Sequence, residues 1–455
     1  PWQRDGLVSL PWPDAAPAAL RPVGGLSTLS ADVQQGVLQF VARDVPAMGY
    51  QTYVVAAPAE AHTELTCDPQ QHNLVSPHFT VTLDPLRGGV RQLVDRHTGR
   101  PWADDAAPHA FGQYLYERFD RDQVAAYVQA YVKIDTLWAL NELGKPDLPP
   151  AAEVPYQALA PAGFRVSYEQ TPVAVSAIME STPSERLQHR VTTRVTLYQD
   201  LPCVDLEVTV HDKPADSWPE AGWICLPVRA SAPQFRLGRL GSIVDPARDL
   251  VPGSNHNLLG LHTGLGVIDQ SGAGFGICAL DSPLVSLEAP GCWKYDPAFV
   301  PQRSHVFLNL FSNQWTTNFR LWNEGTWTSR VRCWPLAEGA ADQSLTATAL
   351  EARYPLQAAA TSAAAGPLPP VQEGVCVSRK GVLVTTFGQN VDGDGTLLRL
   401  WELAGQSGAC TVRLPQALAS RRVRAVDLRG QPLATPAALV PDGDSLQLTL
   451  APFAP

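Results

Sequence analysis

The chain has 455 residues, of which 45% are hydrophobic and 17% are charged, and its formal net charge is −10. A negative chain without a basic run is not expected to bind nucleic acid, and no apolar stretch approaches the roughly 20 residues that a membrane helix needs. Its 41 prolines and 34 glycines favour many short strands joined by tight turns over long helices.

The eight cysteines are scattered along the chain, and no C-x-x-C motif occurs. This spacing favours separate buried thiols in a cytoplasmic protein over a disulfide framework. No signal peptide opens the sequence. We therefore expect a cytoplasmic location.

Residues 1–63 contain two short strand patterns, at 6–10 and 36–41, followed by DVPAMGYQTY at 44–53. Proline and glycine there predict a turn that leads into another strand. These residues are predicted to form a small β-domain.

Residues 79–102, FTVTLDPLRGGVRQLVDRHTGRPW, begin with strict alternation. Phe79, Val81 and Leu83 would point to one face of a strand, with the polar residues between them on the other face. A proline-glycine turn at 84–89 and a second strand at 90–95 follow. The stretch predicts a β-meander.

These two stretches together resemble family 38 glycoside hydrolases, the α-mannosidases and their relatives. V-P-A-x-G-Y-x-T-Y closes the small β-domain of that family, and L-D-P, Gly-Gly, V-x-x-L-V-D and T-G-R mark the entry to its large, galactose-mutarotase-like β-sandwich. The resemblance implies an all-β chain that forms the C-terminal portion of such an enzyme. It places the large sandwich at residues 64–355.

The aromatic run at 111–116 predicts a further strand. Gly112–Tyr116 is similar to the family's G-x-Y-L-aromatic strand, in which the tyrosine reaches toward the bound sugar. The resemblance therefore implies a substrate-binding role for Tyr114. The alternative interpretation is a half-buried tyrosine within the sheet.

Residues 120–143 are the only long helix that the sequence predicts. Asp120 can cap its start, and Gly144 with Pro146 can end it. Apolar residues recur there at the helical spacing of three and four: Val124, Tyr127, Val128, Tyr131, Ile134 and Trp138. We interpret the aromatic members as core residues.

Asparagine, tryptophan and threonine alternate through residues 307–325. Aromatic faces stack on sugar rings, and amides hydrogen-bond to sugar hydroxyls, so Asn313, Trp315 and Asn318 are candidate substrate-binding residues. A buried tryptophan cluster explains the same composition. The segment also resembles F-N-N-x-W-x-T-N-F in bacterial members of the superfamily, which favours one wall of a sugar site.

Residues 356–370, LQAAATSAAAGPLPP, have the composition of a linker. Strand patterns resume beyond it, and residues 371–455 are predicted to form a compact C-terminal β-sandwich. LLRLWELAG at 397–405 resembles the L-x-R-L-x-E-x-x-G strand of the family's last domain.

The family's members are retaining α-glycosidases whose catalytic carboxylates and zinc lie in an N-terminal α/β barrel. Neither those motifs nor a metal-ligand spacing such as H-x-H appears here. We therefore expect no catalytic residue, metal or cofactor in this chain, with zinc held by an upstream catalytic domain. The sequence begins at Pro1 rather than methionine, which fits a missing upstream domain.

The function implied is that of a non-catalytic portion that binds carbohydrate and completes the sugar site of the upstream domain. Two alternatives remain open. One is a carbohydrate-binding scaffold, and the other is a stand-alone sugar epimerase or lyase. An epimerase needs a carboxylate base and a histidine acid, for which the candidates are Glu117, Glu288 or Glu324 with His109 or His305.

Overall fold

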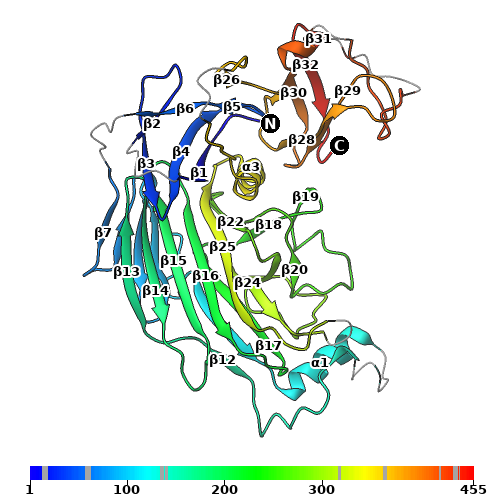
Figure 1. Cartoon of the computed structure of the whole chain (residues 1–455). Coiled ribbons are helices and arrows are strands. Elements are labelled where there is room, and N and C mark those ends of the chain that lie inside the picture. Colours follow the sequence, from blue (N-terminus) through cyan, green and yellow to red (C-terminus); the bar gives the residue numbers. More distant parts are fainter. Residues whose placement is uncertain are drawn as a thin grey trace. The chain divides into compact units, whose positions relative to one another are not determined.

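The structure is a computed structural model that describes residues 1–12, 19–56, 63–133, 138, 142–315, 319–361, 366–419, 422–433, 439 and 441–454. The chain forms two compact units. The first combines Pro1–His62, Leu240–Ile243 and Asp342–Pro455, and the second combines Thr63–Arg239 and Val244–Ala341. Figure 1 shows that strands dominate both units, which confirms the all-β prediction.

The second unit is a large sandwich. Its six-stranded sheet has the order β12 (Gln157–Leu159), β11 (Gln113–Arg118), β17 (Glu220–Pro227), β24 (His305–Ser312), β23 (Leu284–Leu287) and β20 (Leu259–Gly260). The facing sheet runs β13 (Phe164–Gln170), β14 (Ala174–Ser181), β15 (Arg190–Tyr198), β16 (Val204–Lys213), β25 (Gly325–Leu336), β22 (Gly274–Ala279), β21 (Leu265–Ile268) and β18 (Gln234–Arg239). β19 (Ser242–Val244) follows at the boundary of the two units.

A third sheet of the second unit contains the predicted meander. Its order is β10 (Gly89–Asp95), β9 (Phe79–Asp84), β8 (Asn73–Val75) and β7 (Thr66–Asp68). β9 and β10 pair antiparallel from Asp84–Gly89 at the turn to Phe79–Asp95 at the far end, as predicted. The alternating residues Phe79, Val81 and Leu83 are buried, because this face of the strand packs into the main core.

The main core lies between the sheets of the second unit and follows their alternation. Val204, Leu206, Val208 and Val210 of β16 are all buried there, with more exposed residues between them. β17 differs, because all eight of its residues are buried. A strand covered on both faces needs a continuous apolar run rather than alternation.

Helix α1 (Arg121–Val132) covers the outer face of the six-stranded sheet. Asp120 caps it as predicted, and Asp120 and Gln123 form a reciprocal capping box. Val124, Tyr127 and Val128 pack with residues of β11, β17 and β24 in a second core. α1 ends at Lys133, which has a left-handed backbone. Within the rest of the predicted range of 120–143, residues 138, 142 and 143 are helical again, and the others lie outside the described residues.

The first unit contains a five-stranded sheet with the order β1 (Arg4–Pro11), β4 (Val37–Val45), β3 (Leu29–Gln34), β2 (Ala19–Pro22) and β6 (Tyr53–Ala56). β5 (Tyr50–Gln51) pairs with β26 (Val371–Gln372). The V-P-A-x-G-Y stretch therefore ends in a strand whose pairing partner, Val371–Gln372, follows the predicted linker. The predicted boundaries at 63, 355 and 370 stay predictions.

The C-terminal part of the first unit forms the small sandwich expected after residue 371. One sheet runs β27 (Cys376–Val377), β30 (Gly408–Arg413), β32 (Ser445–Leu450) and β31 (Pro441–Asp442), and the other is the hairpin of β28 (Val382–Gln389) and β29 (Thr396–Glu402). A short 3-10 turn, η1 (Gln416–Leu418), follows β30.

A second helix, α3 (Ala341–Arg353), was not predicted. Its apolar face is built largely from small residues and two leucines, so it lacks the bulky periodic pattern that identified α1. Ala347 and Leu350 pack against Val375 and Val377 of the small sandwich. The helix thus belongs to the C-terminal core.

Glu402 at the end of β29 is fully buried and holds this small sandwich together. Its carboxylate accepts hydrogen bonds from the backbone N–H groups of Ala404 (3.1 Å), Gln406 (3.1 Å) and Phe453 (2.9 Å). Nη2 of Arg379 lies 3.9 Å from the same carboxylate and balances its charge. The three backbone donors stabilise the ionised carboxylate, which in turn fixes the turn after β29 and the segment at Phe453.

We therefore expect Glu402→Ala to lower the free energy of unfolding by about 3 kcal/mol, because three backbone donors lose their acceptor. Chemical denaturation followed by circular dichroism measures this loss. Glu338→Ala, at an exposed position, is the control and should change stability by less than about 0.5 kcal/mol. Equal effects of the two substitutions would contradict the assignment.

Candidate functional site

Tyr114 lies inside the main core. It is 1% exposed, and its hydroxyl is 2.8 Å from Nε2 of His189, which is also buried. Burial raises the pKa of Tyr114 well above its usual value. The alternation of β11 sends Tyr114 and Tyr116 inward and Leu115 and Glu117 outward. Tyr114 is therefore a buried tyrosine within the sheet, packed in the main core.

Asn313 is 2% exposed, and its amide is fully used within the chain. Its Oδ1 accepts from the N–H of Glu220 at 2.8 Å. Its Nδ2 donates to the carbonyls of Trp218 at 2.6 Å and Leu321 at 2.9 Å. Asn313 therefore ties the start of β17 to the loop after β24 and fixes the direction in which the chain continues to Trp315.

Trp315 is half-buried and packs edge-on against two tyrosines of α1. The ring centroids lie 5.9 Å from Tyr127 and 5.1 Å from Tyr131. Tyr131, which is 42% exposed, also contacts Tyr295 at 5.7 Å. We call Tyr131, Tyr295 and Trp315 the aromatic surface. Asn318 lies outside the described residues. Of the three predicted site residues that the structure describes, Tyr114 and Asn313 are buried and only Trp315 is partly exposed.

A buried ion pair that was not predicted from the sequence joins the last residue of β16, Lys213, to the first residue of β17, Glu220. Nζ of Lys213 is 2.7 Å from Oε1 of Glu220, and these side chains are 2% and 0% exposed. The hydroxyl of Tyr116 donates to Oε2 of Glu220 at 2.5 Å. Lys213 also donates to the carbonyl of Asn323 at 2.9 Å. Burial raises the pKa of Glu220, while Lys213 opposes that shift.

Further charges surround this pair. Arg118 forms an ion pair with Asp216. Nζ of Lys145 is buried without a hydrogen-bond partner in the described part of the chain. Burial lowers the pKa of Lys145 to about 8, and the carboxylates of Glu220 and Asp216 partly counter that effect. The cluster therefore carries three cations, counting Lys213, and two anions.

Glu117 is the other buried carboxylate of this sheet, and it lies on the opposite face. It accepts hydrogen bonds from the hydroxyl of Tyr156 at 2.6 Å and from Nε1 of Trp223 at 2.7 Å. Burial raises its pKa. Because the sheet separates Glu117 from Glu220, the two carboxyl groups cannot flank one glycosidic bond, which retaining hydrolysis requires.

The residues considered for an epimerase have other partners. Glu288 accepts from the backbone N–H of Gln302 at 2.6 Å and pairs with Arg303 at 3.2 Å. His305 lies 3.3 Å from a carboxylate oxygen of Asp104, and His109 packs edge-on against Phe307. The side-chain contacts of Glu117 and Glu288 described above involve no histidine, although the backbone N–H of Glu288 donates to the carbonyl of His305 at 2.7 Å. Glu324 is exposed.

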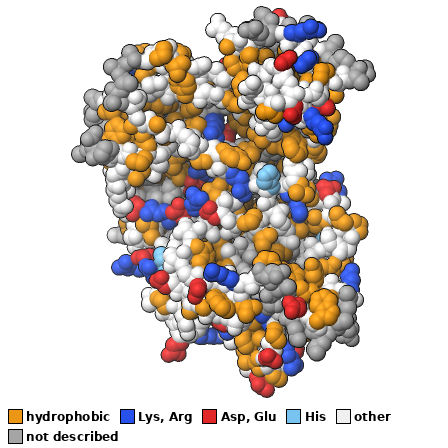
Figure 2. Space-filling model, turned by 45° about the vertical axis from the view of Figure 1, so that its right-hand side comes forward, with side chains coloured by type: hydrophobic (Ala, Val, Ile, Leu, Met, Phe, Trp, Pro, Cys, Tyr) orange, Lys and Arg blue, Asp and Glu red, His pale blue; other side chains and the backbone are white. Residues whose placement is uncertain are grey.

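The described residues contain no group of three or more His, Cys, Asp or Glu side chains placed to hold a metal ion. Within the same ranges, no helix is long and apolar enough to cross a membrane. The face in Figure 2 shows hydrophobic side chains mixed with charges of both signs.

The pair of Lys213 and Glu220 gives a stability prediction. Lys213→Met should lower the free energy of unfolding by about 3–5 kcal/mol, because it leaves a buried carboxylate without its cation. Adding Glu220→Gln should recover at least half of that loss. Urea denaturation measures both. Arg165→Met, in the exposed pair with Glu180, is the control and should cost under about 1 kcal/mol. Additive losses in the double variant would contradict a direct pairing.

His189 gives a pH prediction. Burial, and secondarily the charge of Lys213, lowers its pKa from 6.5 to about 4. The unfolded chain therefore binds this proton more readily. Above pH 6.5 His189 is neutral in both the folded and the unfolded chain, and its contribution to the free energy of unfolding is fully present. As the pH falls toward 4, protonation favours the unfolded chain, and the free energy of unfolding decreases by up to about 3 kcal/mol.

Unfolding free energies of the wild type and His189→Gln between pH 7 and pH 4.5 test this expectation. The carboxylates that titrate nearby are common to both proteins, so the difference isolates His189. The variant should show the flatter dependence on pH, and parallel curves would contradict a neutral, buried histidine.

Comparison with known proteins identifies the fold. Residues 381–454 match the family model described as Glycosyl hydrolases family 38 C-terminal beta sandwich domain. The whole chain resembles an alpha-mannosidase from Enterococcus faecalis V583, with a TM-score of 0.67, 12% identity, and coverage of 100% of this chain and 54% of that one. The chain also resembles a protein in the glycosyl hydrolase family 38 from Enterococcus faecalis, with a TM-score of 0.66, 12% identity, and coverage of 99% of this chain and 52% of that one.

A putative aldose 1-epimerase from Escherichia coli K12 is far less similar, with a TM-score of 0.35 and 9% identity, which is too low to support a shared activity. A search of curated protein sequences finds no match. The chain spans about half the length of the two Enterococcus structures. Residues 381–454 thus match the family 38 C-terminal β-sandwich model, and the chain has, over its whole length, the fold of the matched part of an alpha-mannosidase structure.

Proposed function

We propose that this chain is the non-catalytic, C-terminal portion of an α-mannosidase-like glycoside hydrolase. In this proposal it binds carbohydrate and completes the sugar site of an upstream, zinc-dependent catalytic domain. The main support is the fold comparison, in which the whole of this chain matches about half of an alpha-mannosidase. The family 38 domain at residues 381–454 supports the same assignment. A cytoplasmic location remains part of the proposal.

The aromatic surface is the part of the large sandwich that we propose contacts the sugar. Tyr131 and Trp315 are partly exposed, and α1 holds them in fixed, edge-on packing. Such rings offer apolar faces for the C–H groups of a pyranose. Asn313 has no free hydrogen-bonding group, so we assign it the role of positioning Trp315. Asn318 stays a prediction from the sequence.

In this proposal Tyr114 does not contact the sugar directly. Its hydroxyl is held by His189 in the core, and its strand also carries the outward residues that support α1. We propose that it positions the sheet beneath the aromatic surface. A wall that only orients a substrate still affects the rate strongly, because cleavage depends on alignment of the reacting groups.

The buried carboxylates support placing the chemistry elsewhere. Glu117 and Glu220 have raised pKa values but lie on opposite faces of one sheet, each bonded to side chains of this chain. We therefore assign the nucleophile, the acid/base and the zinc to the upstream domain, and no cofactor to this chain.

An activity assay tests the division of labour. The purified chain should not hydrolyse aryl α-mannosides, with zinc present or with a chelator present, because it contributes only a binding wall. Release of the aryl group above the rate of the buffer alone is the measurement. Turnover that co-purifies with the chain and is lost on Glu220→Gln or Glu117→Gln would contradict the proposal.

A binding experiment tests the aromatic surface. Isothermal titration calorimetry with mannose and α-linked manno-oligosaccharides should detect binding that Trp315→Ala weakens about tenfold, the equivalent of roughly 1.4 kcal/mol for a lost stacking contact. Trp401→Ala is the matched control, since Trp401 is 36% exposed and lies in the other unit. The absence of heat with every sugar, or equal loss in both variants, would favour a scaffold without a sugar site.

A further inference from the structure

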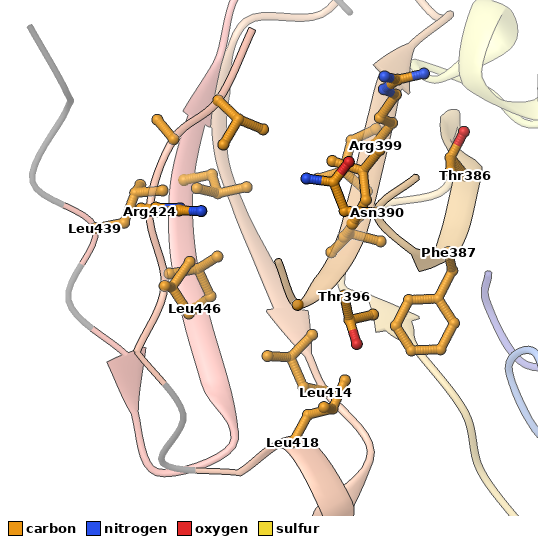
Figure 3. A pocket seen from close by; sticks show the side chains of 18 of the residues that line it. Thr386, Phe387, Asn390, Thr396, Arg399, Leu414, Leu418, Arg424, Leu439 and Leu446 are labelled. Carbon is orange, nitrogen blue, oxygen red and sulfur yellow. The ribbon is translucent and has the colours of Figure 1, made fainter. Parts of the chain in front are cut away.

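The small C-terminal sandwich contains a cavity of about 1150 Å³. It lies between the β28–β29 hairpin and the sheet that contains β30 and β32, and the segment 422–428 closes part of it (Figure 3). Its volume is slightly larger than the roughly 300–1,000 Å³ typical of ligand pockets. The cavity lies wholly within the first unit.

The walls of the cavity are leucine-rich, and the two sheets present these leucines toward each other. Leu398 and Leu400 on β29 line one side, and Leu446, Leu448 and Leu450 on β32 line the other. All but Leu446 are only partly buried. In a filled sandwich such residues would cover one another, so the hollow leaves apolar surface that an apolar chain could remove from water.

The charged residues that line the cavity are three arginines and two aspartates: Arg399, Arg422, Arg424, Asp394 and Asp427. Asp427 is used within the chain, since it accepts from the N–H groups of Arg429 at 2.8 Å and Gln431 at 2.9 Å. Arg399 donates to the carbonyl of Leu428. These two groups are therefore engaged in holding the loop around the cavity.

Within the described part of the chain, the side chains of Arg422, Arg424 and Asp394 make no hydrogen bond or ion pair, and all three are exposed at the rim of the cavity. Figure 3 shows the side chain of Arg424 directed into the cavity, beside Leu439 and Leu446. A guanidinium at the edge of an apolar chamber is a receptor for a carboxylate, because it offers two parallel N–H donors. An apolar cavity with a cation at its rim complements an amphiphile, because the leucines can contact its hydrocarbon chain and the cation can pair with its negatively charged head group.

We propose that this cavity binds a long-chain carboxylate. The acyl chain lies between the leucines of β29 and β32, and the carboxylate pairs with Arg424. The site is separate from the aromatic surface, so the proposal does not depend on the function proposed above.

Calorimetry on the full chain tests the proposal with hexadecanoate, kept below its micelle concentration. The probe should bind at one site, at least about tenfold more tightly than hexadecan-1-ol, which has the same chain and no charge. Arg424→Met should reduce the affinity for hexadecanoate to that for the alcohol. Arg429→Met, at an exposed arginine outside the lining, should leave it unchanged.

A second measurement locates the chain and does not depend on the arginine variant. Trp401 lines the cavity, so hexadecanoate brominated along its chain should quench part of the tryptophan fluorescence, and Trp401→Phe should remove that part. Either no binding of hexadecanoate, equal affinity for the alcohol, an unchanged Arg424→Met variant, or quenching that persists in Trp401→Phe would overturn the proposal.

Discussion

The burial of β17 on both faces is the constraint on which the large sandwich depends. One face of the strand closes the main core between the sheets, and the other is covered by α1 through Trp223, Tyr127 and Val128. A strand placed in this way fixes the position of the helix, and the helix fixes the aromatic surface. The position of the aromatic surface is therefore determined by the packing of the large sandwich.

The buried polar groups follow from the same geometry. β17 begins at Glu220, where the apolar core meets the end of the sheet, and Lys213 reaches this carboxylate from the last residue of β16. Low polarity makes each of these groups costly alone and strongly coupled together. Lys213, Glu220 and Tyr116 satisfy one another in a structural network, whereas Nζ of Lys145 has no hydrogen-bond partner among the described residues.

Much of the fold could be predicted from the sequence where the local pattern and the tertiary environment agree. Alternation identified β9 and β10, and the helical spacing with Asp120 identified α1. α3 was missed because its buried face consists largely of small residues, which carry little periodic signal. The pairing of β5 with β26 joins segments more than 300 residues apart, and no local pattern reports such a contact.

The candidate site was less predictable, for two physical reasons. A tyrosine in an aromatic strand can face either side, and only the register between β11 and β17 shows that Tyr114 faces inward. Asparagine suits a sugar hydroxyl and a backbone carbonyl equally well, so the sequence could not show that Asn313 is used internally. Lys213 and Glu220 flank a turn between strands of different sheets, and two charged residues beside a turn are most often exposed.

The central claim is that the chain binds carbohydrate at the aromatic surface while the chemistry resides elsewhere. Hydrogen–deuterium exchange of the full chain, with and without an α-mannoside, tests it most directly. The account predicts slower exchange confined to the amides of residues 127–133, 293–295 and 313–315. Protection that appears instead around Glu117 and Glu220 alone, or no change anywhere at saturating sugar, would contradict it.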